Sequence, residues 1–404
     1  MKAAEIRRHL FAQRLGLTLL SLGLCAGVVE LVARASLPDG YYVWPPNYRR
    51  TVQLPPDALQ GVRGPSTLTI NDTGMRGDPI PTGRRYRLLA VGGSTTICTC
   101  LDDREAWPHL VQGRVNAVLG EDALWVGNVG RPGHTTAQHV LQVEKLLAQH
   151  PEIDAVILLI GINDFVSYLH SLRPQVSGSK TAQSLRRPAL EPPARRSTDA
   201  AFRIAFSLYP GWDAELPWYQ RTGIARQLAT TRWRVLERTG DLRFLDRTGT
   251  LYEEARALRR RARFRDSLPD LRAGLARYEK GILDTIEAAR DTRVILLTQP
   301  TLWRSGLSPE EEDLIWGVGP PIDQVTIESE FYTTEALATG MKSYNERLLQ
   351  ACRTRKVECP DLAKELPRDG SVFSDDAHLT ERGSRMIAAA VADYLLARPP
   401  FSSP

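Results

Sequence analysis

Apolar runs alternate with helical segments from residue 84 to the C-terminal region, and this alternation restricts the chain to few folds. Strands are expected at residues 86–91, 123–129, 155–160, 293–298 and 356–362, and helices at 106–119, 137–148, 271–289 and 381–397. The run at 155–160 is apolar throughout, as in a strand that is covered on both faces. The alternation therefore predicts an α/β protein whose parallel sheet lies between two helical layers.

Two long segments interrupt this alternation, at about residues 167–270 and 302–333. The first is rich in Ser, Pro and Arg, and helices are expected within it at 220–245 and 251–264. Both segments follow the carboxyl ends of predicted strands, where an open α/β sheet binds its ligands. We therefore expect helical insertions at the C-terminal edge of the sheet that contribute to a substrate-binding cap. The Arg259–Arg261 run is expected to be a solvated helix face.

The N-terminal segment carries four basic residues ahead of a long apolar run. These are Lys2, Arg7, Arg8 and Arg14, which precede the run at residues 15–33. The run is long enough for a helix to span a bilayer, and the basic residues predict that the N-terminus stays inside. A cleaved signal peptide is the alternative, because residues 33–35 resemble a cleavage site. Both interpretations place the rest of the chain outside the cytoplasm, in the periplasm.

The chain is therefore expected to have three parts. Residues 1–36 form a single-pass membrane anchor or a signal segment. Residues 37–83 contain several Pro and aromatic residues and form a juxtamembrane linker and lead-in. Residues 84–400 form the folded domain, which includes both insertions.

Composition and a few special residues limit the partners. The net charge of +5 is modest, and the excess Arg is expected on a solvated surface, with an anionic glycan or a membrane surface as the alternative partner. No nucleic-acid-binding motif accompanies it, which argues against that partner. His134 and His139 do not share a helix face, so neither a metal nor another cofactor is expected. Cys352 and Cys359 either bridge a helix end to the next strand or remain free and buried.

A Ser residue ends the first strand of the alternating region. Ser94 follows the Gly92-Gly93 turn, which would lift its Oγ out of the sheet and direct its N–H towards a reacting carbonyl. A helix N-cap is the alternative role for such a Ser. A phosphate-binding loop is disfavoured, because the glycine spacing of those loops is missing. Ser94 is therefore the candidate nucleophile.

The candidate acid–base pair lies close to the other end of the chain. His378 would accept the proton of Ser94, and activity should then fall below about pH 6 as His378 becomes protonated. Asp375, three residues earlier, can reach His378 Nδ1 within one turn and fix the tautomer. Asp376 is the adjacent competitor for this role, and a surface turn is the alternative for the whole segment.

Two further residues are candidate donors to an oxyanion. Gly133 and Asn163 both follow predicted strands, so a parallel sheet would bring them to the same edge as Ser94. Gly133 can present its backbone N–H without a side chain in the way, and Asn163 can present its amide. Each could instead be an ordinary turn residue. Their order at successive strand ends, together with Ser94 and the Asp-x-x-His pair, favours an acyl-transfer site.

The four segments resemble the conserved blocks of the SGNH hydrolases in the GDSL esterase/lipase superfamily. They are Gly92–Thr95, Asn128–Gly133, Gly161–Asp164 and Asp375–His378. The resemblance implies a flavodoxin-like α/β/α sandwich and ester chemistry without a metal. It also assigns catalysis to Ser94, Asp375 and His378, and the oxyanion hole to Ser94, Gly133 and Asn163. Residues 71–77 resemble the lead-in of membrane-anchored bacterial members.

One departure from that family is visible: Gly93 stands where the family has Asp. This Asp is not a catalytic group in the family, so its loss does not weaken the expectation of an enzyme. The expected activity is hydrolysis of acyl esters, acetyl esters included, on an acylated glycan or lipid. Two alternatives are an O-acyltransferase that modifies a cell-envelope glycan and a non-catalytic envelope-assembly protein on the same fold.

Overall fold

The computed structural model describes residues 2–36, 40–52, 59–83, 85–120, 123–172, 222–225, 227–228, 231, 248–318 and 330–402. The chain divides into two compact units, residues 1–41 with 189–242, and residues 42–188 with 243–404. Most of the Ser-, Pro- and Arg-rich part of the first insertion, and most of the helix predicted at 220–245, lie outside the described residues. The sheet and all candidate site residues belong to the second unit.

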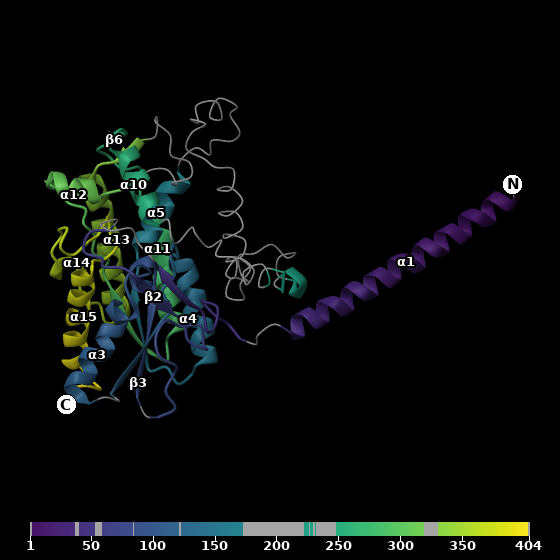
Figure 1. Cartoon of the computed structure of the whole chain (residues 1–404), viewed down its shortest axis with the longest axis horizontal. Coiled ribbons are helices and arrows are strands. Elements are labelled where there is room, and N and C mark those ends of the chain that lie inside the picture. The colour runs from purple at the N-terminus through teal and green to yellow at the C-terminus, as the bar shows by residue number, and fades with distance from the viewer. Residues whose placement is uncertain are drawn as a thin grey trace. The chain divides into compact units, whose positions relative to one another are not determined.

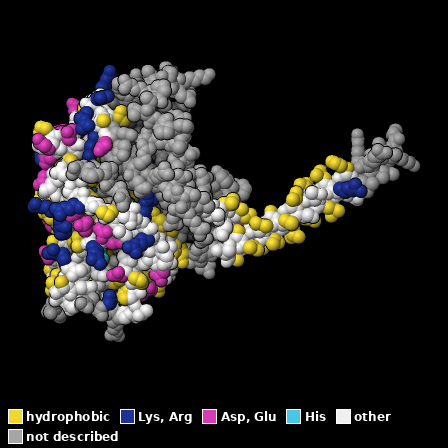
Figure 2. All heavy atoms as spheres, viewed as in Figure 1, with side chains coloured by type: hydrophobic (Ala, Val, Ile, Leu, Met, Phe, Trp, Pro, Cys, Tyr) yellow, Lys and Arg dark blue, Asp and Glu magenta, His cyan; other side chains and the backbone are white. Residues whose placement is uncertain are grey.

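The first unit contains the long N-terminal helix α1, Lys2–Ala35. Its segment Gln13–Ala35 has a mean hydropathy of 2.1 and is long and apolar enough to cross a membrane, as a signal sequence near an N-terminus also is. Figure 2 shows hydrophobic side chains along most of this helix. Near its end, the carboxylate of Glu30 accepts the backbone N–H groups of Gly223 and Ile224 and pairs with Arg34.

The second unit is built on a parallel sheet of four strands, as the alternation predicted. The strands are β3 (Tyr86–Gly92), β4 (Leu124–Asn128), β5 (Ala155–Leu159) and β7 (Arg293–Leu297), in the order β4-β3-β5-β7. Every residue of β4 and β5 is buried, because helices cover both faces. The sheet order reverses between β4 and β5, so β3 lies at the topological switch point, where flavodoxin-like sheets bind ligands.

The fifth strand that we expected at residues 356–362 is reduced to one bridge. Glu358 pairs in parallel with Ile295, and its carbonyl accepts the N–H of Leu296 at 2.9 Å. Pro360 follows two residues later and has no N–H to continue the ladder. The prediction of a fifth strand is therefore wrong in extent, although its place beside β7 is right.

Helices cover the two faces of the sheet. Helix α3 (Trp107–Leu119) packs against α15 (Glu381–Leu396). Helix α4 (Thr136–Gln149) packs against α11 (Arg272–Ala288), which also contacts α13 (Thr334–Arg355) and α5 (Ile162–Ser171). The β3-to-β4 and β4-to-β5 connections run in opposite directions, and right-handed crossovers then place α3 and α4 on opposite faces. The result is the three-layer sandwich in Figure 1.

Several elements of the second unit were not anticipated. Helix α13 is the longest of them; the Thr333 side chain caps its start, and Lys356 ends it in the left-handed region. Helix α5 begins at Ile162, directly after β5, and its last turns extend into the start of the first insertion. The helix expected at 251–264 is present as α10 (Thr248–Arg259), which ends before β6 (Arg263–Arg265). The other elements are β1 (Arg49–Val52), β2 (Ser66–Thr69), α2 (Ser94–Ile97), the 3-10 turn η1 (Asp103–Glu105), α12 (Pro309–Leu314), β8 (Glu330–Tyr332) and α14 (Leu362–Glu365).

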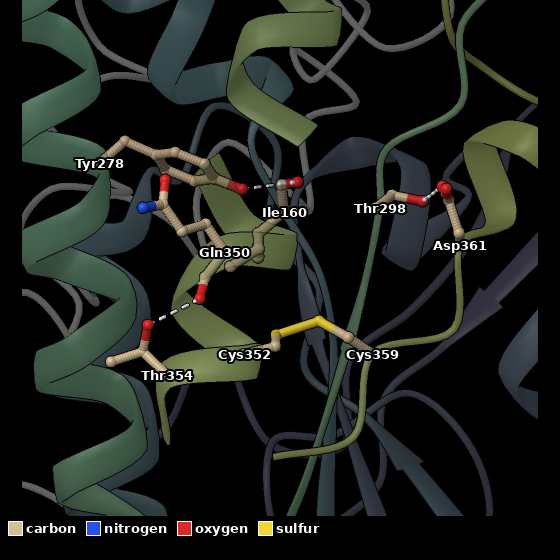
Figure 3. Close-up of a disulfide and its surroundings, with 8 residues drawn as sticks. All are labelled: Ile160, Tyr278, Thr298, Gln350, Cys352, Thr354, Cys359 and Asp361. Atoms are coloured by element: carbon tan, nitrogen blue, oxygen red, sulfur yellow. Dashed lines mark hydrogen bonds between the residues drawn. A yellow bond between two sulfur atoms is a disulfide. The ribbon is translucent and has the colours of Figure 1, made fainter. Parts of the chain in front are cut away.

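One end of α13 is tied to the segment beside β7. Cys352, in the last turns of α13, forms a disulfide with Cys359, and their Cα atoms lie 6.2 Å apart. Close by, the Thr298 hydroxyl donates to Asp361 at 2.7 Å. Figure 3 shows the disulfide running from α13, and the hydrogen bond from the residue after β7, to the same stretch of chain. The alternative of two free, buried thiols is thereby excluded in this structure.

Candidate active site

The turn after β3 carries the candidate nucleophile. Ser94 is the first residue of the short helix α2 and is half-buried, and its carbonyl accepts the N–H of Cys98. A Cβ on Gly92 would overlap Thr96, and one on Gly93 would overlap the amide nitrogen of Asn163. The two glycines thus allow the strand-to-helix turn to close and bring Asn163 against the residue that precedes Ser94.

The end of β4 and the loop after it are held to that turn by the Asn128 side chain and by a backbone hydrogen bond. Asn128 donates from Nδ2 to Thr96 O at 2.8 Å and accepts the N–H of Gly130 at 2.9 Å. The N–H of Arg131 donates to Gly92 O at 2.8 Å. Gly133, two residues further on, has a φ of +78°, in the left-handed region that favours glycine, and no atoms crowd the position of its missing Cβ.

Asn163 lies in the first turn of α5, directly after β5. Its Nδ2 donates to His134 O at 2.8 Å, next to Gly133. An amide nitrogen has two hydrogens, so one remains after this bond is made. Gly161, the residue before α5, has a φ of +121°, and a Cβ there would overlap the Tyr278 hydroxyl. The ends of β3, β4 and β5 therefore meet at one edge of the sheet, where Ser94, Gly133 and Asn163 are located.

Asp375 and His378 form a hydrogen-bonded pair before α15. His378 Nδ1 lies 2.7 Å from Asp375 Oδ2, and because an ionised carboxylate only accepts, Nδ1 is the donor. The other oxygen, Oδ1, accepts the backbone N–H groups of Ala377 at 2.9 Å and His378 at 2.7 Å. The Asp375 side chain is fully buried, whereas that of His378 keeps 30% of its surface exposed. The imidazole thus has one edge fixed and another accessible.

The charges of this pair reinforce each other. Burial acts to raise the pKa of Asp375, but the charge of His378 and the hydrogen bonds that Asp375 accepts lower it to about 2. Burial acts to lower the pKa of His378, but the charge of Asp375 and the hydrogen bond to it outweigh burial, and the pKa is raised above its usual value. Asp375 is therefore ionised over the physiological range, and His378 binds a proton more readily than a free histidine.

Asp376 is occupied elsewhere. Its Oδ1 accepts the indole N–H of Trp303 at 2.6 Å, and its Oδ2 accepts the backbone N–H groups of Trp316 at 3.1 Å and Gly317 at 2.9 Å. Burial and the adjacent charge of Asp375 raise the pKa of this carboxyl. The two neighbouring Asp residues thus have separate partners, and the one that orients His378 is Asp375.

Two arginines near the site differ from what the sequence predicted: Arg259 is buried, and Arg76 has a structural role that was not predicted. Arg259 is 6% exposed and pairs with Glu312 at 2.9 Å, so this member of the Arg run does not lie on a solvated face. Arg76 is buried and donates to the carbonyls of Ile97, Cys98 and Leu101, behind α2. The position of Arg76 within residues 71–77, the segment that resembles the family's lead-in, was the sequence signal for this role. The sequence alone did not predict which groups the guanidinium contacts.

The buried histidines beside the oxyanion loop do not form a metal centre. Burial lowers the pKa of His139 to about 4 and lowers that of His134 as well. His139 Nδ1 lies 2.9 Å from the Gln142 side-chain oxygen. Among the residues that the structure describes, no three His, Cys, Asp or Glu side chains are grouped as a metal site would require. These histidines are therefore neutral packing residues below the loop that carries Gly133.

Comparisons with known proteins agree with this fold. The sequence model of the GDSL-like lipase/acylhydrolase family matches residues 90–386. Among solved structures, an acetyl xylan esterase, AlAXEase, is 13% identical, with a TM-score of 0.38, covering 77% of this chain and all of that one. A lipase/acylhydrolase from Enterococcus faecalis is 13% identical, with a TM-score of 0.38, covering 79% of this chain and all of that one.

The acetylxylan esterase Axe2 from Geobacillus stearothermophilus is 14% identical, with a TM-score of 0.36, and the match covers 76% of this chain and 93% of that one. No curated protein sequence matches the chain. The family match spans most of the sheet, the loops that follow β3, β4 and β5, and the Asp375–His378 segment. The chain therefore belongs to the GDSL-like lipase/acylhydrolase family and is a hydrolase that acts on ester bonds.

Proposed function

We propose that this protein is a serine esterase that hydrolyses acyl esters, acetyl esters included, outside the cytoplasm. The observation that carries the proposal is the 2.7 Å hydrogen bond between His378 Nδ1 and Asp375 Oδ2. A buried, ionised carboxylate that orients one imidazole edge, while the other edge stays accessible, is the arrangement that a general base for Ser requires. Ser94 supplies the hydroxyl at the switch point of the sheet.

The proposed reaction has two acyl-transfer steps. Ser94 Oγ attacks the ester carbonyl as His378 Nε2 takes its proton, and the alcohol leaves with that proton. A water molecule, deprotonated by His378, then attacks the acyl-enzyme and releases the acid. Asp375 stabilises the imidazolium in both steps. The N–H groups of Ser94 and Gly133 and the remaining amide hydrogen of Asn163 stabilise the oxyanion.

The N-terminal region supports the proposed location. The apolar segment Gln13–Ala35 can serve as a membrane anchor or a signal sequence, and the preceding basic residues favour an N-terminus inside. We propose that residues 1–36 deliver the chain to the membrane, that 37–83 lead into the fold, and that 84–400 form the catalytic domain in the periplasm. The insertions at about 167–270 and 302–333 are proposed to form the substrate-binding cap.

Labelling of the full-length protein with a fluorophosphonate probe tests the proposal. The wild-type protein should be labelled, and Ser94→Ala and His378→Ala should not. Ser343→Ala is the matched control, because it removes a hydroxyl that bonds only its own helix, α13. Labelling that persists in folded Ser94→Ala, or a folded wild-type protein that never reacts, would contradict a Ser94 nucleophile.

A second measurement separates hydrolysis from transfer. The unlabelled wild-type protein is incubated with esters of graded acyl length, with and without a cell-envelope glycan as acceptor. Release of free acid at the same rate in both cases supports hydrolysis. Acylated glycan formed at the expense of free acid would identify an O-acyltransferase that uses the same residues.

A further inference from the structure

Asp375 Oδ2, the oxygen that accepts the hydrogen bond from His378, has a second partner, which lies in the second insertion. Trp316 Nε1 donates to Asp375 Oδ2 at 3.1 Å, beside the 2.7 Å bond from His378 Nδ1. Trp316 lies 59 residues earlier in the sequence, in the segment after β7. We infer that Trp316 is a positioning residue for the catalytic pair, and that the second insertion is a working part of the site. This inference rests on the proposed function and deepens it.

Trp316 is held by its backbone as well as by its side chain. Asp376 accepts the N–H groups of Trp316 and Gly317, and the indole of the buried Trp303 donates to the same carboxylate. Gly317 has a φ of +78°, and a Cβ there would press against Arg259 and Phe331. Two adjacent carboxylates thus act on one segment: Asp376 fixes its backbone, and Asp375 receives its indole hydrogen.

The first insertion braces the same segment. Arg256, in α10, donates from Nε to Leu314 O at 3.2 Å and from Nη2 to Ser374 O at 3.1 Å. Arg259, one turn later, pairs with Glu312. Arg256 therefore links the residues directly before Trp316 to the residue directly before Asp375. The first insertion thus holds the chain before Trp316 and the chain before Asp375 together.

The shared acceptor has a chemical consequence. Two N–H donors on one oxygen restrict the carboxylate to one orientation. They also share the negative charge of that oxygen, so each donor weakens the hydrogen bond of the other. Without the indole, Asp375 would hold the imidazolium more strongly but position it less well. Three charged groups lie near the pair: Asp376 on the same loop, Arg259, which acts on Asp376, and Arg256, which donates to Ser374 O. Cys100, which faces Asp375, is a neutral thiol because burial raises its pKa to about 12.

Two substitutions at one position separate the hydrogen bond from the ring. Trp316→Phe keeps an aromatic ring and removes the donor. Trp316→Gln removes the ring and keeps an N–H donor the same number of bonds from the backbone. Trp125→Phe is the matched control, because the buried indole of Trp125 donates to Asp78 O, a backbone carbonyl away from the pair. All variants are made in the full-length chain, and thermal unfolding checks that they are folded.

The first readout is the rate of fluorophosphonate labelling against pH, which needs no natural substrate. Trp316→Phe should label about tenfold more slowly, with its acid limb moved to higher pH by on the order of half a unit, as loss of a donor to a charged group implies. Trp316→Gln should recover most of the rate, and Trp125→Phe should label as the wild type. If Trp316→Phe is unfolded, Trp316→Gln decides: a near-normal rate supports the inference, and a full loss overturns it.

Three results would overturn the inference: labelling of Trp316→Phe like the wild type, equal losses in Trp316→Phe and Trp316→Gln, or an unshifted acid limb. The second readout is the imidazole titration of His378 followed by NMR, with His378→Gln to assign the signal. It applies even if the wild type is not labelled, which would count against the proposed function alone. An upward shift in Trp316→Phe would then support the role of Trp316, and no shift would reject it.

Discussion

Gly93 is the residue at which this chain departs from the family motif, and the geometry explains why the position has no side chain. The Asn163 amide nitrogen occupies the space that a Cβ on Gly93 would need. The same amide nitrogen is anchored to His134 O. Asn163 therefore approaches the nucleophile turn more closely than a side chain at 93 would permit. An Asp at position 93 would therefore collide with the Asn163 amide in its present position.

Gly93→Ala tests this close approach. The new Cβ should displace the Asn163 amide and remove one oxyanion donor, so kcat should fall by about 10²–10³. Gly113→Ala in α3 is the matched control: nothing crowds that position, and replacing a helical Gly with Ala should stabilise the protein by about 0.5–1 kcal/mol without changing kcat. An unchanged kcat in Gly93→Ala would show that Asn163 does not act from its present position.

The proposed role of His378 as general base predicts how activity depends on pH. A general base must be neutral, and because Asp375 raises the pKa of His378 more than burial lowers it, activity should be lost at a higher pH than with an ordinary histidine. The acid limb of kcat/KM should thus lie above the pKa of an ordinary histidine, about 6.5, and not at the pH of about 6 expected from the sequence. Asp375→Asn should lower kcat by about 10⁴. A wild-type limb below 6.5 would contradict the interaction.

At the scale of elements, the lead-in before β3 stabilises the nucleophile helix from behind. Arg76 pairs in an isolated antiparallel bridge with Asn128, the last residue of β4. Its guanidinium reaches carbonyls on both sides of the turn that follows α2 and pairs with Asp103 at 2.8 Å. The lead-in is therefore part of the folded unit, and it links β2, α2 and β4.

Arg76→Met should show how much this clamp contributes. The substitution leaves several buried carbonyls and Asp103 without their partner, so we expect a loss of stability on the order of 3–5 kcal/mol and a lower rate of Ser94 labelling. Arg272→Met, which breaks an exposed ion pair with Asp270, should change stability by less than about 0.5 kcal/mol. Denaturant unfolding measures both. Equal stability of the two variants would argue against a clamp.

At the scale of the whole molecule, the catalytic unit is a minimal sheet with long additions. Within the described residues, four strands and one bridge form the central layer, and both insertions contact the Asp375–His378 loop, through Arg256 and Trp316. The insertions thus do more than enlarge the surface around the site. They hold the Asp375–His378 loop in place. In a larger sheet, a further strand could have this role.

The sequence predicted some elements well and others poorly, for physical reasons. Strands β3, β4, β5 and β7 are buried on both faces, so they appear as uninterrupted apolar runs. Helix α13 escaped prediction because its buried face includes Gly340, Asn345 and Ala351, which weaken an apolar period. The fifth strand was overestimated because the sequence did not show that its pairing with β7 is limited to one bridge at Glu358, two residues before Pro360.

For this protein, the sequence alone determined the sheet, the order of the candidate residues and the local Asp375–His378 pair. These depend on runs of neighbouring residues or on a separation of three positions, over which chain geometry leaves few options. The tertiary structure alone decided that Gly93 meets Asn163, that Asp376 binds the Trp316 segment, and that Trp316 shares Asp375 with His378. Those contacts join residues 59 to 70 positions apart, and only the packing of the whole unit sets them.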